Sequence, residues 1–155
     1  MSAITLTSAE LAEQERTLRL SRFGHDEALA LGQRLVDLAR ERDLPIGIGV
    51  DIGDQRVFRA GMPGTCGDHD RWLDRKFAAV RRFDRCSLEL ELRAHVEPDY
   101  VAERGLDPAA IVLCGGAFPL RVGAVSVGVV GVAGLTSEQD HELTVEALTA
   151  FAADD

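Results

Sequence analysis

Hydrophobic and polar residues follow two different periods along this chain, and together they predict a mixed fold of helices and strands. Apolar residues recur at helical spacing over residues 26–42 and 68–85, and again in the segment that follows Ser137. Residues 46–52 instead alternate strictly between isoleucine or valine and glycine or aspartate. This alternation predicts a strand with one apolar face and one glycine face, which a helix or a ligand can approach closely.

Shorter patterns complete the expected order of elements. Thr7 and Glu10 have the spacing of a capping box and predict a short first helix, and Ser137 is the expected cap of the last one. Segment 87–92 fits either a helix or a strand. We expect a short helix at 97–104 and hairpin turns at 53–54 and 123–124. Further strands are expected at residues 18–23, 57–60, 111–114, 118–122 and 125–132, the last of them central because it is valine-rich on both faces.

Composition places the chain among ordinary globular proteins. With 155 residues, 46% of them hydrophobic, residues 1–155 are expected to form a single domain. A net charge of −9 argues against nucleic acid or an anionic membrane as the main partner. The segment Met1–Arg19 lacks the pattern of a signal peptide. Cys66, Cys86 and Cys114 are odd in number and widely spaced, which favours a reduced, cytoplasmic location and no metal site.

The basic residues are sixteen arginines and a single lysine, Lys76, whose position is unusual. On a helical projection Lys76 lies between Trp72 and Val80, inside the apolar arc of its helix. One interpretation is a lysine whose stem covers Trp72 while its ammonium reaches water. The other is a lysine at the edge of a pocket, where it binds an anion or transfers a proton. The sequence leaves both open.

A glycine loop and a histidine mark a second candidate region. Gly115 and Gly116 precede an apolar strand, and their backbone N–H groups are accessible to a ligand. His141 shares the core-facing stripe of the last helix with Val145 and Leu148. It lies near the positive end of that helix, which favours a neutral ring. Such a ring either satisfies nearby backbone carbonyl groups or serves a ligand, and both interpretations stay open.

The chain resembles a known family, the heme-degrading-domain family with its GlcG-like and HbpS-like members. The resemblance rests on the run Gly115–Arg121, the following VGVVGVAGL, the pair Asp140-His141, and the residues Asp70, Trp72, Arg75, Lys76, Phe83 and Ser87. It extends over nearly the whole chain, from Glu13 to Phe151, and is strongest with a branch of uncharacterised small cytoplasmic proteins.

The resemblance implies a profilin-like α/β fold of three layers, α/β/α, around a central antiparallel sheet of about five strands. It also implies symmetric homo-oligomers, and some relatives bind heme or other small ligands. One position departs from the pattern: the branch often has a histidine before the double glycine, where this chain has Cys114. A cysteine ligates heme iron only when it is deprotonated.

The function that these observations favour is binding of a small molecule by an oligomeric cytoplasmic protein. The candidate ligand-binding residues are Trp72, Lys76, Gly115, Gly116, Phe118, Arg121 and His141. One alternative is heme binding or processing, with an axial ligand from His69, His95, His141 or Cys114, and heme is the one cofactor that the resemblance suggests. The other alternative is an oligomeric adaptor without catalytic activity. A catalytic motif is missing, and only a pairing of Lys76 with His141 would offer acid–base chemistry, so enzymatic activity stays open.

Overall fold

The computed structural model describes residues 3–155. Met1 and Ser2, the start of the segment in which we expect no signal peptide, lie outside the described residues. The elements follow in the order α1 (Ser8–Thr17), α2 (His25–Arg42), β1 (Gly47–Ile52), β2 (Gln55–Gly61), α3 (Gly67–Phe83), α4 (Ser87–Val96), α5 (Tyr100–Glu103), β3 (Ala117–Val122), β4 (Val125–Ala133) and α6 (Ser137–Ala153). Segment 87–92, which the sequence left undecided, is therefore helical.

The strands form one antiparallel sheet in the order β2-β1-β4-β3. It consists of two hairpins, β1–β2 and β3–β4, and the predicted turns at residues 53–54 and 123–124 connect their strands. The hairpins join where β1 pairs with β4, from Gly47 opposite Ala133 to Ile52 opposite Gly128. The valine-rich strand β4 is central, as its apolar character on both faces predicts.

Two of the predicted strands are wrong, so the described residues form a sheet of four strands rather than about five. Segment 18–23 makes a single bridge, between Leu20 and Val122, before the chain turns away towards α2. Segment 111–114 is irregular, and its Val112 N–H donates to the carbonyl of Arg75 in α3. At the start of β3 the partner of the Ala117 N–H is the Ser87 hydroxyl of α4, 3.0 Å away. A helix thus occupies a place where a further strand would pair.

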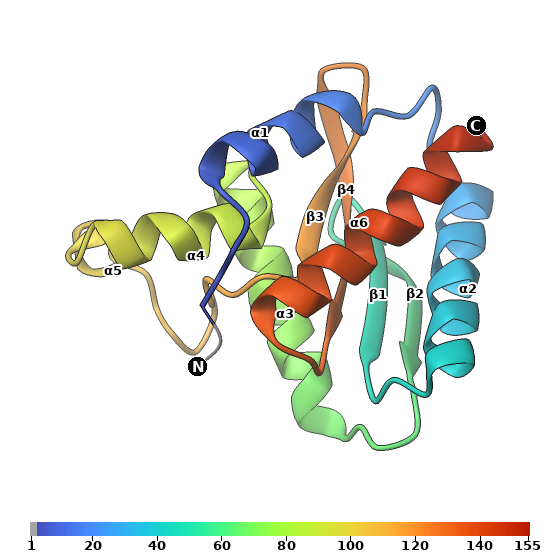
Figure 1. The fold of residues 1–155 in the computed structure, drawn as a ribbon, viewed down its shortest axis with the longest axis horizontal. Coiled ribbons are helices and arrows are strands. Elements are labelled where there is room, and N and C mark those ends of the chain that lie inside the picture. Colours follow the sequence, from blue (N-terminus) through green and yellow to red (C-terminus); the bar gives the residue numbers. More distant parts are fainter. Residues whose placement is uncertain (1–2) are drawn as a thin grey trace.

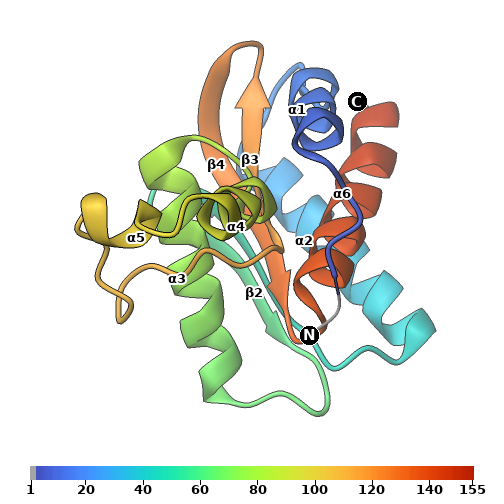
Figure 2. The same ribbon diagram turned by 60° about the vertical axis from the view of Figure 1, so that its left-hand side comes forward.

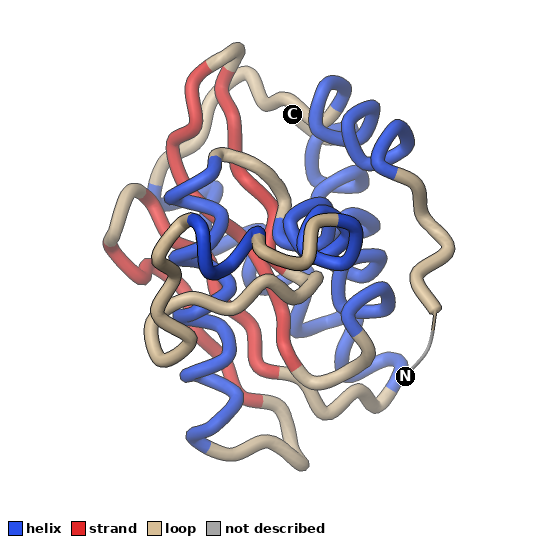
Figure 3. Tube along the Cα trace, turned by 90° about the vertical axis from the view of Figure 1, so that its left-hand side faces the viewer, coloured by secondary structure: helices blue, strands red, loops and turns tan. Residues whose placement is uncertain are grey.

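Helices cover both faces of the sheet and make the three layers that the resemblance implies. Helices α2 and α6 lie in front of the sheet in Figure 1, and α3 lies behind it. Figures 2 and 3 show the sheet between these two helical layers, and Figure 1 shows α4 and α5 extending to the left beyond β3. Within residues 3–155, the helices all lack the combination of length and apolar character needed to cross a membrane.

The two faces of the sheet differ in how closely helices approach. Ile48 and Val50 of β1 belong to the larger core, on the side of α2 and α6. On the other side, a Cβ atom built on Gly49 would lie 3.2 Å from Cζ of Phe77, and one on Gly131 would lie 2.8 Å from its Cε1. The predicted glycine face is therefore the face that receives helix α3.

The capping residues fix where the first and last helices begin. Thr7 and Glu10 form the predicted capping box: the Thr7 hydroxyl accepts from the Glu10 N–H at 3.2 Å, and Glu10 accepts from the Thr7 N–H at 2.7 Å. The cap of α6 is Thr136 and not Ser137, because the Thr136 hydroxyl accepts from the N–H of Gln139. Ser137 is instead the first helical residue.

The close approach of α3 to the sheet predicts the effect of a single methyl group. Gly131→Ala places Cβ within 2.7 Å of the Gly116 carbonyl oxygen and against Phe77, so we expect a loss of about 1–3 kcal/mol of unfolding free energy, measured by urea denaturation. The matched control is Gly67→Ala, because a Cβ there has no neighbour within 4 Å. Equal stability of the two variants would contradict this account of the glycine face.

Candidate functional site

Lys76 of α3 ends inside the protein, where it meets residues from β4 and α6. Its side chain is 5% exposed, and Nζ donates to Oδ2 of Asp140 at 3.0 Å and to the carbonyl oxygen of Val132 at 3.1 Å. The first interpretation of this lysine, in which the ammonium reaches water, is therefore wrong. The ammonium forms a buried ion pair instead.

Asp140 is held in place from two directions. Besides Lys76, it accepts from the backbone N–H of Leu135 at 3.0 Å and from that of Gly134 at 3.3 Å, both in the loop between β4 and α6. Burial raises the pKa of the Asp140 carboxyl above its ordinary value, while Lys76 and the two N–H groups act in the opposite direction. With all these donors aimed at it, Asp140 is the anionic partner of Lys76. Asp140 is not among the candidate residues that the sequence suggests, although a lone lysine in an apolar arc signals that a counter-ion is needed.

The double glycine gives the ion pair its room. A Cβ on Gly116 would lie 2.9 Å from Nζ of Lys76 and 2.5 Å from the Val132 carbonyl oxygen, and its φ of +131° is one that side chains disfavour. A Cβ on Gly115 would lie 2.4 Å from the carbonyl oxygen of Ser137. These glycines let the chain pass between the start of α6 and the end of Lys76.

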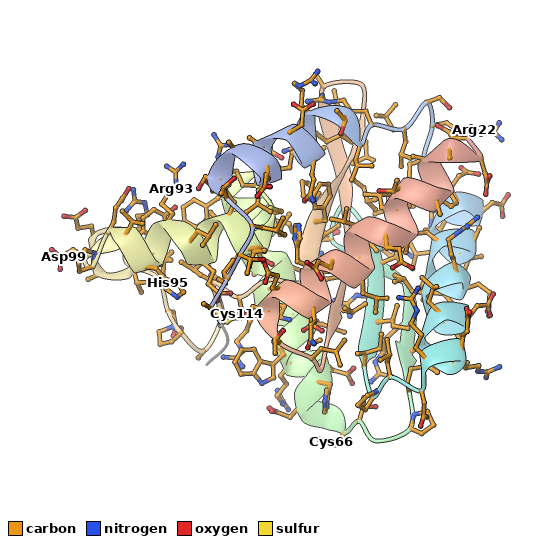
Figure 4. All side chains as sticks on the ribbon, in the orientation of Figure 1. Arg22, Cys66, Arg93, His95, Asp99 and Cys114 are labelled. Atoms are coloured by element: carbon orange, nitrogen blue, oxygen red, sulfur yellow. The ribbon has the colours of Figure 1, made fainter. Side chains whose placement is uncertain are left out.

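A pocket of about 290 Å³ opens beside the ion pair, between the N-terminal half of α3 and the loop that leads into α6. Its lining residues are Asp68, His69, Trp72, Lys76, Cys114, Ala133, Gly134, Leu135, Ser137 and Asp140. Figure 4 shows Cys114 near the first turn of α6 and Cys66 at the start of α3. The volume is at the lower end of the range for sites that bind small molecules.

The structure brings together some of the candidate residues and separates others. Trp72 and Lys76 line the pocket, and Gly116 lies against Lys76. Arg121 lies elsewhere, where it donates to Glu15 of α1 and to Asp84 at the end of α3.

His141 and Phe118 are enclosed near α1 rather than in the pocket lining. His141 is 0% exposed, and its Nε2 lies 2.7 Å from Oε1 of Gln14. Its Nδ1 has no partner among the described residues, and its ring centroid lies 6.0 Å from that of Phe118. Burial lowers the pKa of His141 to about 4, so the ring is neutral at pH 7.

The remaining groups of the pocket are a thiol and a second imidazole. Burial raises the pKa of Cys114, and the negative charge of Glu91 raises it to a smaller extent. The thiol is therefore protonated at pH 7. Nδ1 of His69 accepts from the backbone N–H of Cys66 at 3.1 Å, which leaves the proton of the neutral ring on Nε2. Within residues 3–155, histidine, cysteine and acidic side chains do not gather into groups of three that could hold a metal ion.

The described residues form an α/β fold around one antiparallel sheet, with a small pocket at the junction of α3, β4 and α6. The chain belongs to the HbpS-like heme-degrading family: residues 23–149 match the family described as "Haem degrading protein HbpS-like". The resemblance stated from the sequence is thereby confirmed.

Individual relatives extend this similarity over almost the whole chain. A UPF0303 protein of Streptomyces coelicolor is 44% identical over 147 residues, which cover 94% of this chain and 93% of that protein. The crystal structure of the Ybr137w protein has a TM-score of 0.87 at 24% identity, with 96% of this chain and 90% of that chain covered. The crystal structure of a PduOC:heme complex has a TM-score of 0.68 at 21% identity, with 83% and 94% covered. At these identities the two structures support the fold alone.

The buried ion pair predicts a pH-dependent cost when one partner is removed. Lys76→Met leaves the Asp140 carboxylate buried without its cation, so we expect a loss of about 3–5 kcal/mol of unfolding free energy near pH 7. Burial then holds the pKa of Asp140 above its unfolded value. The folded variant binds a proton more readily than the unfolded chain, and its deficit relative to wild type shrinks as the pH falls.

Urea denaturation of both proteins at several pH values measures this deficit. The double variant Lys76→Met/Asp140→Asn is the control, and it should lose less than the sum of the two single variants because their effects are coupled. A deficit that stays constant with pH, or additive single effects, would contradict the ion pair.

The enclosed His141 makes a separate prediction. Its folded pKa of about 4 lies below the ordinary value of 6.5, so the unfolded chain binds the proton first as the pH falls between these values. As the pH falls from 6.5 to 4, wild type should therefore lose roughly 3 kcal/mol of unfolding free energy relative to His141→Gln. Above pH 6.5 the difference between the two proteins should stay constant. Urea denaturation across this range tests it, with the exposed His95→Gln as a control for mutagenesis. Parallel stability curves for wild type and His141→Gln would show that the ring is not kept neutral by burial.

Proposed function

We propose that this protein binds a small metabolite in the pocket beside Lys76 and Asp140. The observation that supports this function best is a buried charged pair that also lines a ligand-sized hollow. A pair kept only for stability has no need of such an opening, and apolar side chains of similar volume often serve stability as well or better. A concave site with a few convergent polar groups is the usual form of a small-molecule site.

The same proposal includes a cytoplasmic location and a homo-oligomer. Three cysteines without a disulfide among them fit a reducing compartment. The homo-oligomer is the assembly that the resemblance to the family implies.

Heme binding is the second candidate, favoured by the family description and by the fold shared with the PduOC:heme complex. The residues of this chain do not fit heme held within one subunit. His141 is enclosed and engaged by Gln14, the Cys114 thiol is kept protonated, and a pocket of about 290 Å³ offers little room for a macrocycle. Of the four histidines, His69 alone lines that pocket.

Two experiments separate these functions. The first is a thermal-shift screen of small carboxylic acids, amines and amino acids. For each compound that raises the melting temperature, mass spectrometry then measures whether it protects Cys114 from alkylation by iodoacetamide. We expect at least one compound that raises the melting temperature and protects Cys114 in wild type, with about tenfold weaker binding to Trp72→Ala. The control is Val125→Ala, an exposed position in the β3–β4 hairpin outside the pocket lining.

The second experiment is a titration with hemin, which follows the Soret band in wild type, His69→Ala and His141→Ala. We expect no saturable shift in any of them. A saturable shift that is lost in His69→Ala would make heme the ligand of this pocket. Absence of any compound that protects Cys114 would overturn the proposed small-molecule site.

A further inference from the structure

Three side chains of α3 line the pocket at a regular spacing. Asp68, Trp72 and Lys76 stand at positions i, i+4 and i+8, so they follow one face of the helix. Each step is about 6 Å along the helix axis, and the whole row spans about 12 Å. The pocket therefore has an inner end at Lys76, a middle at Trp72 and an outer end at Asp68.

The inner end offers a hydrogen-bond donor. An ammonium carries three N–H groups, and two of those on Lys76 are used by Val132 and Asp140. The third has no partner among residues 3–155, although Nζ belongs to a side chain that is 5% exposed and lines the pocket. Because Lys76 lines the pocket, this N–H is available to an oxygen acceptor of a ligand, such as a carbonyl or carboxylate.

The middle of the row is flat and held in position. The Trp72 Nε1–H donates to Oδ2 of Asp68 at 3.2 Å, and the guanidinium of Arg75 lies 4.5 Å from the centre of the indole ring. Ala133 and Leu135 supply further apolar lining. This part of the pocket suits a flat or apolar group that packs against the indole.

The outer end carries the exposed carboxylate of Asp68, in the first turn of α3. Asp68 forms no ion pair within the described part of the chain, and its only side-chain hydrogen bond is the one from Trp72, on Oδ2. Oδ1 is thus available to a ligand. His69, which shares this end of the pocket, is already engaged through Nδ1 by Cys66. A cationic nitrogen is the ligand group that best complements a free carboxylate.

We infer that the ligand of this pocket is bipolar, with an oxygen acceptor on Lys76, a flat or apolar middle on Trp72 and a cationic nitrogen on Asp68. The inference rests on the proposed function and specifies the chemical class of its ligand. Zwitterionic aromatic or heterocyclic amines with a carboxylate have this form. A dianion such as heme does not, because it supplies no cation for Asp68.

Three matched probes test the order of these groups: 4-(aminomethyl)benzoate carries both charges, 4-methylbenzoate the carboxylate alone and 4-methylbenzylamine the ammonium alone. Calorimetric titration should show the bipolar probe binding wild type about tenfold more tightly than either single-ended probe. Asp68→Asn should remove its advantage over 4-methylbenzoate and leave 4-methylbenzoate itself unchanged. The control is Asp74→Asn, the same substitution on α3 outside the lining of this pocket, which should preserve the order.

Each contrary result has a definite meaning. Equal affinity for the three probes, or an equal effect of Asp68→Asn and Asp74→Asn, would overturn the bipolar ligand. No measurable binding of 4-(aminomethyl)benzoate at millimolar concentration would overturn it as well. None of these outcomes affects the proposed function, which is decided by protection of Cys114 in the metabolite screen.

Discussion

The arrangement of this site depends on keeping one ammonium and one carboxylate out of water. Removing two such charges from solvent costs several kcal/mol for each ion, and the cost is recovered only when the pair and its remaining hydrogen bonds are well placed. Lys76 and Asp140 meet this requirement with groups from three separate parts of the fold: helix α3, the end of β4 and the first turn of α6. The two glycines before β3 are part of the same constraint, because a side chain on Gly116 would occupy the place of the ammonium.

Much of the fold could be predicted from periodicity, because helix stripes and strand alternation are properties of neighbouring residues. The hairpins, the central position of β4 and the glycine face of β1 are all of this local kind. The two missing strands have a different origin. Residues 111–114 look like a strand, but pairing needs a free sheet edge, and Ser87 of α4 already bonds the start of β3. A single sequence does not show which element covers an edge.

For the candidate site, the sequence likewise indicated single residues but not their partners. The position of Lys76 within an apolar arc marked it as exceptional, and the structure gives it a buried partner. That the partner is Asp140, 64 positions later, depends on how α3 and α6 meet, which periodicity cannot supply. His141 shows the same limit: its place on the inner face of α6 was evident, but that face meets Gln14 of α1 and not the pocket. Membership of the HbpS-like family leaves the ligand open, because neither the family match nor the shared fold identifies what this pocket holds.

The burial of Lys76 has a consequence for the chemistry of the protein's exterior. It is the single lysine of the chain, so the described surface carries its positive side-chain charge on guanidinium groups and presents no side-chain amine. Acylation, methylation and other modifications directed at lysine have no accessible target on this surface. Amine-reactive cross-linkers cannot couple neighbouring copies through surface side chains. A reagent that does acylate a side-chain amine must first enter the pocket or wait for local opening of α3, so its rate reports directly on access to the ion pair.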